Sequence, residues 1–160
     1  MTMEEKGALR LQFLVRVVQK ECKHLTITDR RLFEFSTFTF VQAMQLEENP
    51  DLAERVEAFV GRFARLQDTI GDKLLPLFLG ALGEKISAAI DNLDRAERLG
   101  LIKSADEWMT MRNLRNQMIH EYVEDPVVLV SAMQSGHDFV PVLITAAHQM
   151  IAEIERRGWL

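Results

Sequence analysis

The chain has 160 residues, of which 48% are hydrophobic and 27% are charged, a composition typical of globular domains and not of disordered or fibrous chains. This length is enough to bury a large core without disulfides, so we expect a single helical domain over residues 1–160. The 24 acidic and 19 basic residues give a net charge of −5, which excludes a global positive field that would attract nucleic acid.

The cysteine content and the apolar runs indicate the cellular compartment. Cys22 is the only cysteine, so no disulfide forms within one chain, and no zinc-type Cys/His spacing occurs. We therefore expect no metal, no cofactor and a cytoplasmic protein. No apolar run reaches the ~20 residues of a membrane span, and the acidic start lacks the core of a signal peptide, so we expect no membrane association.

Helical spacing dominates the first half of the chain. Apolar residues three and four positions apart predict a first helix from about Leu11 to Leu25. Thr28 and Asp29 predict the N-cap of a second helix. Its apolar residues would be Leu32, Phe35, Phe38 and Val41. The phenylalanines of positions 33–40 also fit a partly alternating, strand-like pattern, and we prefer the helix.

The third predicted helix has a clear start and an irregular end. Asn49 followed by Pro50 is typical of an N-cap with proline at the first helical position. Gly71 and Pro76 interrupt the apolar run that follows, because proline removes a backbone donor and clashes with the preceding turn. We expect a kink or break within residues 69–83.

A fourth helix is predicted around Ile86, Ile90 and Leu93, and Gly100 can supply the left-handed residue that ends it. Ser104 has the spacing of a capping box with a glutamate three residues later, which predicts that a fifth helix begins near Ala105.

The fifth helix should end by Asp125-Pro126, a pair that can also cap the next helix. A last amphipathic helix is expected after Gly136. Together these elements predict an all-α antiparallel bundle of about five to six helices.

The fifth helix carries the most informative string. Arg115-Asn116 is followed by His120 and then by Tyr122, the only tyrosine. Chance alone would give the Arg/His spacing ~0.3 times and the full string ~0.002 times in such a chain. The string resembles the signature of the HEPN superfamily, in particular of the HepT-like toxins and the related nucleotidyltransferase substrate-binding proteins. The resemblance extends over residues 50–157, in which the family's order is also followed by Gly100-Leu101-Ile102 and Trp108. Residues 1–48 lie outside it.

The resemblance implies a function and partners. It implies a HEPN-like homodimer whose two motifs line a shared cleft, and a metal-independent ribonuclease toxin of a toxin–antitoxin pair. Arg115 and His120 would be catalytic, and Arg112 and Asn116 would bind phosphate or orient the histidine. The partner would be a cognate minimal nucleotidyltransferase antitoxin, for which Tyr122 is a target of adenylylation.

The residue types suit this chemistry. Histidine titrates near neutrality and can move the proton of a ribose 2′-hydroxyl or of a leaving oxygen, while arginine presents a permanently charged fork to phosphate oxygens. On a straight helix Asn116 and His120 lie ~40° apart, whereas Arg115 and His120 diverge by ~140°. Unwinding near His120, the reach of the long arginine, or twofold association would bring the pair together, and the resemblance favours twofold association.

Other interpretations stay open. The chain could be a non-catalytic subunit that presents a nucleotide or substrate to the nucleotidyltransferase, with the same arginine and histidine only holding phosphate. Without the resemblance, Arg115 fits an ion pair with Glu121 or Glu124, and His120 fits a helix-end cap. Trp108 is better explained as a core anchor than as a base-stacking platform.

The acidic residues of the interrupted region carry no assignment. Asp68 and Asp72 lie four residues apart on a possible helix, but Lys73 and solvent explain them as well as a site would. We therefore predict no functional acid pair there.

Overall fold

The computed structural model describes residues 2–34, 37–120 and 124–160, and every regular element among them is helical. The elements are α1 (Met3–Phe33), α2 (Phe40–Met44), α3 (Pro50–Asp68), the π-helix η1 (Thr69–Leu74), α4 (Leu75–Ala81), α5 (Ala89–Arg98), α6 (Ala105–His120) and α7 (Pro126–Arg156). Because α3, η1 and α4 follow one another without a break, they form one rod, and the described residues form six helical rods. The predicted helical bundle is confirmed.

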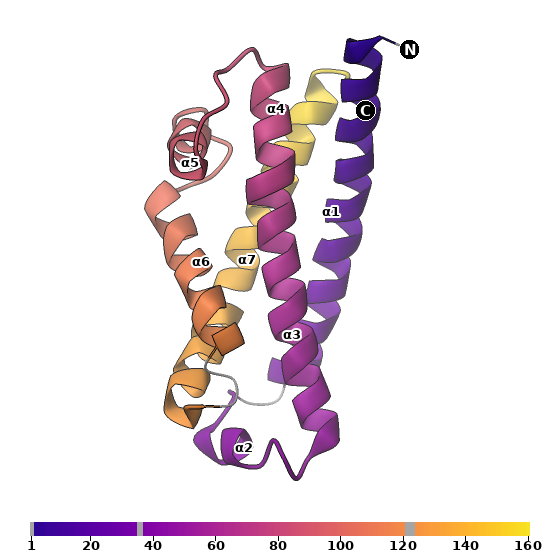
Figure 1. Ribbon diagram of the computed structural model, residues 1–160. Helices are drawn as coiled ribbons and strands as arrows, with labels where there is room; N and C mark the ends of the chain where they lie inside the picture. Colours follow the sequence, from indigo (N-terminus) through magenta and orange to yellow (C-terminus); the bar gives the residue numbers. More distant parts are fainter. Residues whose placement is uncertain (1, 35–36, 121–123) are drawn as a thin grey trace.

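The long axis of the bundle is set by three rods (Figure 1): α1, the α3–η1–α4 rod and α7. α7 contacts α1, α2, α3 and α6, so it is the element around which the others gather. α6 lies beside α7 and runs in the opposite direction, while α5 crosses at the upper left. Both chain termini lie at the top, and α6 ends at the bottom, close to α2 and the start of α7.

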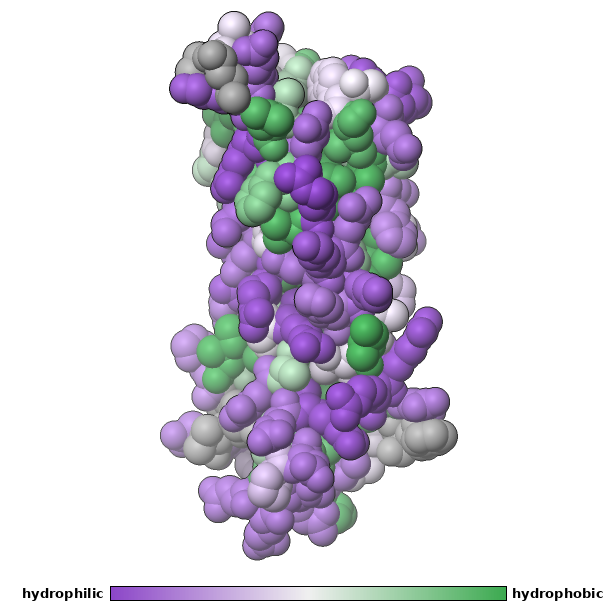
Figure 2. All heavy atoms as spheres, turned by 90° about the vertical axis from the view of Figure 1, so that its right-hand side faces the viewer, coloured by the Kyte–Doolittle hydropathy of each residue, from purple (hydrophilic) through white to green (hydrophobic). Residues whose placement is uncertain are grey.

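The outer face of α1 is largely polar. Figure 2 looks onto this side of the bundle and shows hydrophilic side chains over most of it, with hydrophobic ones gathered toward the end that holds the termini. The opposite face of α1 is buried, as the three-and-four spacing predicts. Its buried residues include Leu14, Val15, Val18, Cys22 and Leu25.

The predicted second helix at Thr28 and Asp29 is wrong, because both residues lie inside α1. Thr28 is buried, and its hydroxyl donates to the carbonyl of His24 at 3.1 Å, one turn earlier. The carboxylate of Asp29 lies 2.7 Å from Nδ1 of His137 on α7. These partners satisfy both side chains within a continuous helix, so neither acts as a cap.

The next helix is shorter and begins later than predicted. α2 begins at Phe40, and Thr39 forms the capping box: its hydroxyl accepts from the amide of Gln42 at 3.2 Å, and the Gln42 side chain accepts from the Thr39 amide at 2.9 Å. Of the residues predicted for this helix, Phe35 lies outside the described part of the chain.

The start of α3 agrees with the prediction, since the Asn49 side chain accepts from the amide of Leu52 at 3.2 Å. The expected kink appears as a change of helix type. In η1 the chain widens, and the amide of Leu75 donates to Ile70, five residues back. A wider turn leaves room for the ring of Pro76, which would otherwise meet the carbonyl four residues earlier. The rod therefore continues to Ala81.

α5 ends at Gly100 as predicted: this glycine has φ +74, and the amide of Leu101 donates to Ala96 at 2.9 Å. Of the residues predicted for it, Ile86 precedes the helix, Ile90 is helical but exposed, and Leu93 is helical and buried. Asn92, a polar residue, is also buried.

The side chain of Asn92 closes the loop before α5. It is 4% exposed, accepts from the amide of Ser87 at 2.9 Å and donates to the Ser87 carbonyl at 3.1 Å. A single asparagine thus satisfies both backbone groups of one loop residue, which explains its place in the core.

α6 begins at Ala105, as predicted. The Ser104 hydroxyl accepts from the amide of Glu107 at 3.1 Å, and the Glu97 carboxylate accepts from the amide of Ala105 at 2.9 Å. The cap of the new helix therefore also ties it to α5.

Gly136 does not begin the last helix. α7 begins at Pro126, where the Asp125 side chain accepts from the amides of two residues in the first turn. A Cβ on Gly136 would lie 3.1 Å from Phe59 and 3.2 Å from the sulfur of Met118. The glycine therefore allows α7 to approach α3 and α6, and the prediction that the last helix begins after it is wrong.

One helix among the described residues, α7, is long and apolar enough to cross a membrane by length and composition. Core helices of water-soluble bundles meet the same criterion, and Leu143, Ala147 and Met150 of α7 are fully buried in this chain. The expectation of no membrane association stays a prediction.

Candidate functional site

α6 divides its side chains between the core and the surface. Its buried residues are Ala105, Trp108, Met111, Leu114 and Met118. The interpretation of Trp108 as a core anchor is confirmed, since this side chain is 3% exposed. The polar residues of the motif lie on the remaining faces of the helix.

A close contact between α6 and η1 sets how the two elements align. A Cβ on Gly71 would lie only 3.0 Å from Nε1 of Trp108, so the absence of a side chain lets the indole pack against the π-helix. The side chain of Gln67 donates to the carbonyl of Trp108 at 3.4 Å. These contacts bring the next turn of α6 level with the junction of α3 and η1.

Two ion pairs follow along this contact, and we call them the arginine–aspartate ladder. Nη1 of Arg115 donates to Oδ1 of Asp68, and Nη2 of Arg112 lies 3.7 Å from Oδ2 of Asp72. The acids are four residues apart and the arginines three, so neighbouring turns of two antiparallel elements pair in order. The ladder joins α6 to the α3–η1 rod.

Arg115 is the more restrained of the two arginines. Its side chain is 21% exposed, against 35% for Arg112. Its Nε is buried and has no hydrogen-bond partner in the described part of the chain. An unsatisfied buried donor costs about 1–3 kcal/mol. An ion pair at the surface does not require this cost, so the burial of Nε distinguishes Arg115 from an ordinary surface arginine. The described partner of Arg115 is Asp68 and not Glu124, while Glu121, the other predicted partner, lies outside the described residues.

Asn116 and His120 are exposed, and His120 is the last residue of α6. No hydrogen bond joins His120 to Arg115 among the described residues, and the arginine is turned to α3. The described contacts therefore do not join the two predicted catalytic side chains, and the angular divergence expected on the helix stays a prediction. Tyr122 lies outside the described residues.

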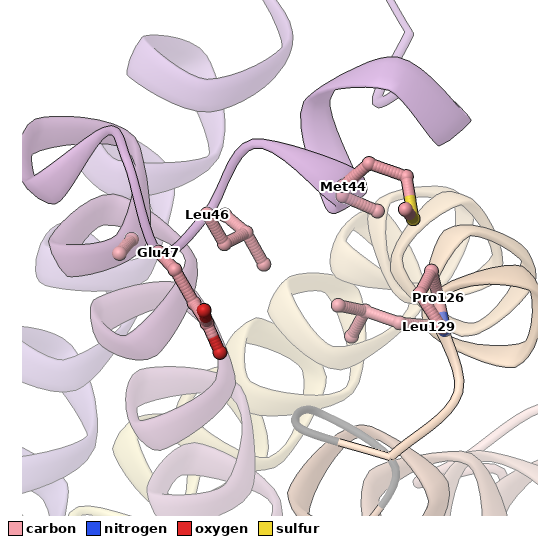
Figure 3. A pocket seen from close by; sticks show the side chains of 7 residues that line it. Met44, Leu46, Glu47, Pro126 and Leu129 are labelled. Carbon is pink, nitrogen blue, oxygen red and sulfur yellow. The ribbon is translucent and has the colours of Figure 1, made fainter.

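Apolar side chains are exposed at the same end of the bundle. Ile119, next to His120, is 45% exposed, and Val127 at the start of α7 is 64% exposed. α2 adds Phe40, Val41 and Met44. A pocket lies between α2 and the first turn of α7 (Figure 3), and Met44 and Pro126 face each other across it. Its other lining residues are Ala43, Leu46, Glu47, Ala53 and Leu129. None of the predicted site residues that the structure describes lines this pocket.

A half-buried carboxylate lies behind the ladder. Burial raises the pKa of Glu21 on α1, and its Oε2 is buried with no hydrogen-bond partner in the described part of the chain. The hydroxyl of Thr69 lies 3.1 Å from Oε1 of Glu21 and 2.8 Å from the carbonyl of Arg65. The Thr69 hydroxyl has one proton and donates it to one of these two acceptors at a time, so Glu21 receives at most one hydrogen bond among the described residues. Burial also raises the pKa of the neighbouring Cys22 thiol to about 11.

The sequence analysis missed Asp68 and Asp72 as partners of the motif. The available signal was that Asp68 and Asp72 lie four residues apart, close to the three-residue separation of Arg112 and Arg115. It became meaningful only once the Gly71–Trp108 contact fixed the alignment of α6 and η1. No group of three or more metal-ligating side chains occurs among the described residues, and the absence of a metal stays a prediction.

No protein family, curated protein or solved structure matched this chain. The HEPN resemblance therefore rests on the residues of α6 and their surroundings alone.

Proposed function

We propose that this chain is a HEPN-type ribonuclease, the toxin of a toxin–antitoxin pair, which cleaves RNA without a metal by means of Arg115 and His120. The observation that carries the proposal is the placement of the motif: His120 is exposed at the end of α6, and Arg115 is anchored one turn earlier by Asp68. Anchored charge and an accessible imidazole are the two elements that phosphodiester cleavage requires.

The proposed chemistry is a transesterification. His120 takes the proton of a ribose 2′-hydroxyl, and the resulting oxygen attacks the adjacent phosphorus. The bond from phosphorus to the 5′-oxygen breaks, this oxygen takes a proton from a water molecule, and His120 returns its proton to solvent. The products are a 2′,3′-cyclic phosphate and a 5′-hydroxyl end. Arg115 stabilises the charge that develops on the phosphorane oxygens.

Two chains are needed in this proposal, because Arg115 faces α3 and His120 lies at the helix end. A twofold arrangement that joins the α6 ends would place Arg115 of one subunit near His120 of the other. The exposed Ile119 and Val127 supply apolar surface for that contact. Asn116, exposed one turn before His120, would orient the imidazole or a phosphate oxygen, and Arg112 would make a second phosphate contact.

The partner in the proposal is a minimal nucleotidyltransferase in the same cytoplasm. It would transfer AMP from ATP to the phenolic oxygen of Tyr122 and release pyrophosphate. The added bulk and negative charge would lie two residues from His120 and would block the cleft. Because Tyr122 is the only tyrosine, labelling with α-phosphate-labelled ATP should disappear in Tyr122→Phe; equal labelling of the variant would refute this part.

The deciding experiment incubates the purified chain with RNA in EDTA. We expect cleavage by the wild type and a ~10²–10⁴-fold loss in His120→Ala, the range of a general acid or base. His148→Ala is the matched control, because His148 is also an exposed helical histidine, and it should retain full activity. Equal cleavage by all three proteins, or cleavage by none, would contradict the proposal.

Mixed dimers test the shared site. Neither Arg115→Ala nor His120→Ala should cleave RNA alone. A heterodimer of the two variants has one site that holds both wild-type side chains, so mixing should restore up to half of the activity per dimer. Mixtures that stay inactive although heterodimers form would show that each site lies within one chain.

A second candidate is the non-catalytic subunit that presents a nucleotide to the nucleotidyltransferase. The specific observation in its favour is that both arginines of the motif region are already paired with aspartates, which leaves little free positive charge for an RNA backbone. The same assay separates the two candidates. Nucleotide binding in calorimetry, with no RNA cleavage by the wild type, would support the binding subunit.

A further inference from the structure

We infer that Asp68 is a positioning residue for Arg115: it holds the guanidinium in one orientation while leaving part of it available to a phosphate. The inference rests on the proposed function for its link to RNA cleavage. The orientation itself is a property of this chain and can be measured without RNA.

The contact between the two side chains is partial. Only Nη1 of Arg115 donates to Asp68, and only to Oδ1, so this is not the two-point fork in which a carboxylate engages two guanidinium nitrogens. The Nε edge is buried. A guanidinium that is bonded at Nη1 and enclosed at Nε has few orientations open to it, and the Arg115 side chain is still 21% exposed.

The surroundings of Asp68 favour a fixed carboxylate. Asp68 is the last residue of α3, and the π-helical turn begins immediately after it at Thr69. One turn along η1, the contact of Gly71 with the buried Trp108 locks η1 to α6. The two backbones that carry Asp68 and Arg115 are therefore held together by core packing, and the ion pair adds only the side-chain orientation.

The Arg112–Asp72 pair of the ladder is looser and serves as an internal comparison. Arg112 and Asp72 are 3.7 Å apart, beyond hydrogen-bond distance, and both side chains are more exposed than Arg115. Exposed pairs of this kind contribute little to orientation or stability. Asp72 should accordingly matter less than Asp68, although the two acids belong to adjacent turns and carry the same charge.

The experiment compares Asp68→Ala and Asp68→Asn with Asp72→Asn and with Asp94→Asn, which removes an exposed charge on α5. Circular dichroism confirms that each variant is folded. For RNA cleavage we expect kcat to fall ~10²-fold in Asp68→Ala, the size of effect that follows from misplacing a catalytic group. Asp68→Asn, which keeps a weaker hydrogen bond, should lose ~10-fold, and the two control variants less than ~3-fold. KM should change little, because the charge of Arg115 is kept.

A second measurement follows the Arg115 Nε–H signal by ¹⁵N NMR, with Arg115→Lys to assign it. We expect an ordered signal in the wild type and in Asp72→Asn, and an averaged, mobile one in Asp68→Ala. This readout needs no activity, so an inactive wild type with this NMR result would refute the proposed function and uphold the positioning role.

Two results would overturn the inference. An Arg115 signal that stays equally ordered in Asp68→Ala would show that packing alone orients the side chain. A gain in cleavage or a lowered KM in the Asp68 variants would show that the carboxylate competes with phosphate for Arg115 and inhibits the site.

Discussion

Gly71 faces the indole of Trp108 so closely that a Cβ on the glycine would lie 3.0 Å from Nε1. We predict that Gly71→Ala destabilises the protein by up to about 2 kcal/mol, since overpacking a buried ring costs about 1–3 kcal/mol and the gain in helix propensity offsets about 1 kcal/mol. Urea unfolding measures the change. Gly7→Ala is the control, because Gly7 lies in α1 with nothing within 4 Å of its Cβ position, and it should stabilise the protein. Stabilisation by both variants would show that the indole moves aside freely.

The loop before α5 should depend on one side chain. Asn92→Ala removes both hydrogen bonds to Ser87 and leaves its amide and carbonyl without these partners, so we expect a loss of about 2–3 kcal/mol of unfolding free energy. Thermal unfolding checks this value. Asp94→Ala, two residues away and exposed, should change stability by less than about 0.5 kcal/mol. Similar effects of both variants would contradict a special role for Asn92.

The raised pKa of Glu21 predicts a pH-dependent cost. Burial favours the protonated carboxyl in the folded state, so stability should fall as pH rises above the ordinary value of 4.5 and through the raised pKa. Glu21→Gln keeps the shape without the charge. We expect this variant to be more stable than the wild type at pH 7 and nearly equal to it at pH 4, in urea unfolding at both values. A less stable variant at pH 7 would mean that attraction to Lys73 and Arg65 outweighs the burial cost.

The exposed apolar residues at the end of α6 and the start of α7 should mediate self-association. We predict that the wild type sediments as a dimer at micromolar concentration and that Val127→Glu sediments as a monomer, because a buried unpaired charge opposes the contact. Leu9→Glu is the control: Leu9 is 50% exposed and belongs to the first turns of α1, which begins at the opposite end of the bundle (Figure 1), so this variant should remain dimeric. RNA cleavage should be lost with the dimer. A monomeric wild type would remove the shared site from the proposal.

The helical elements could be predicted where local signals act alone. The Asn49 cap, the left-handed Gly100 and the Ser104 cap each depend on backbone groups within a few residues, and all three are confirmed. Thr28 and Asp29 carry an equally good cap signal, but partners on α3 and α7 satisfy their side chains and the helix continues. Local chemistry cannot reveal that such partners exist.

The candidate site shows the same limit. The angular divergence of Arg115 and His120 follows from helix geometry and stays a prediction. The pairing of Arg115 with Asp68 spans 47 positions and depends on how η1 lies against α6. That alignment comes from a glycine and a tryptophan whose contact no spacing rule predicts.

The π-helical turn also sets the phase of the long rod. A π-helix holds about one more residue per turn than an α-helix. The side chains of α4 are therefore turned about the rod axis, relative to those of α3, from the positions that a continuous α-helix would give them. Deleting one residue between Thr69 and Leu74 would remove the wide turn and bring the ring of Pro76 against the carbonyl four residues earlier. It would also swing Asp68 by ~100° relative to the buried face of α4, and so part it from Arg115. The surplus residue thus determines which acid meets which base across the bundle.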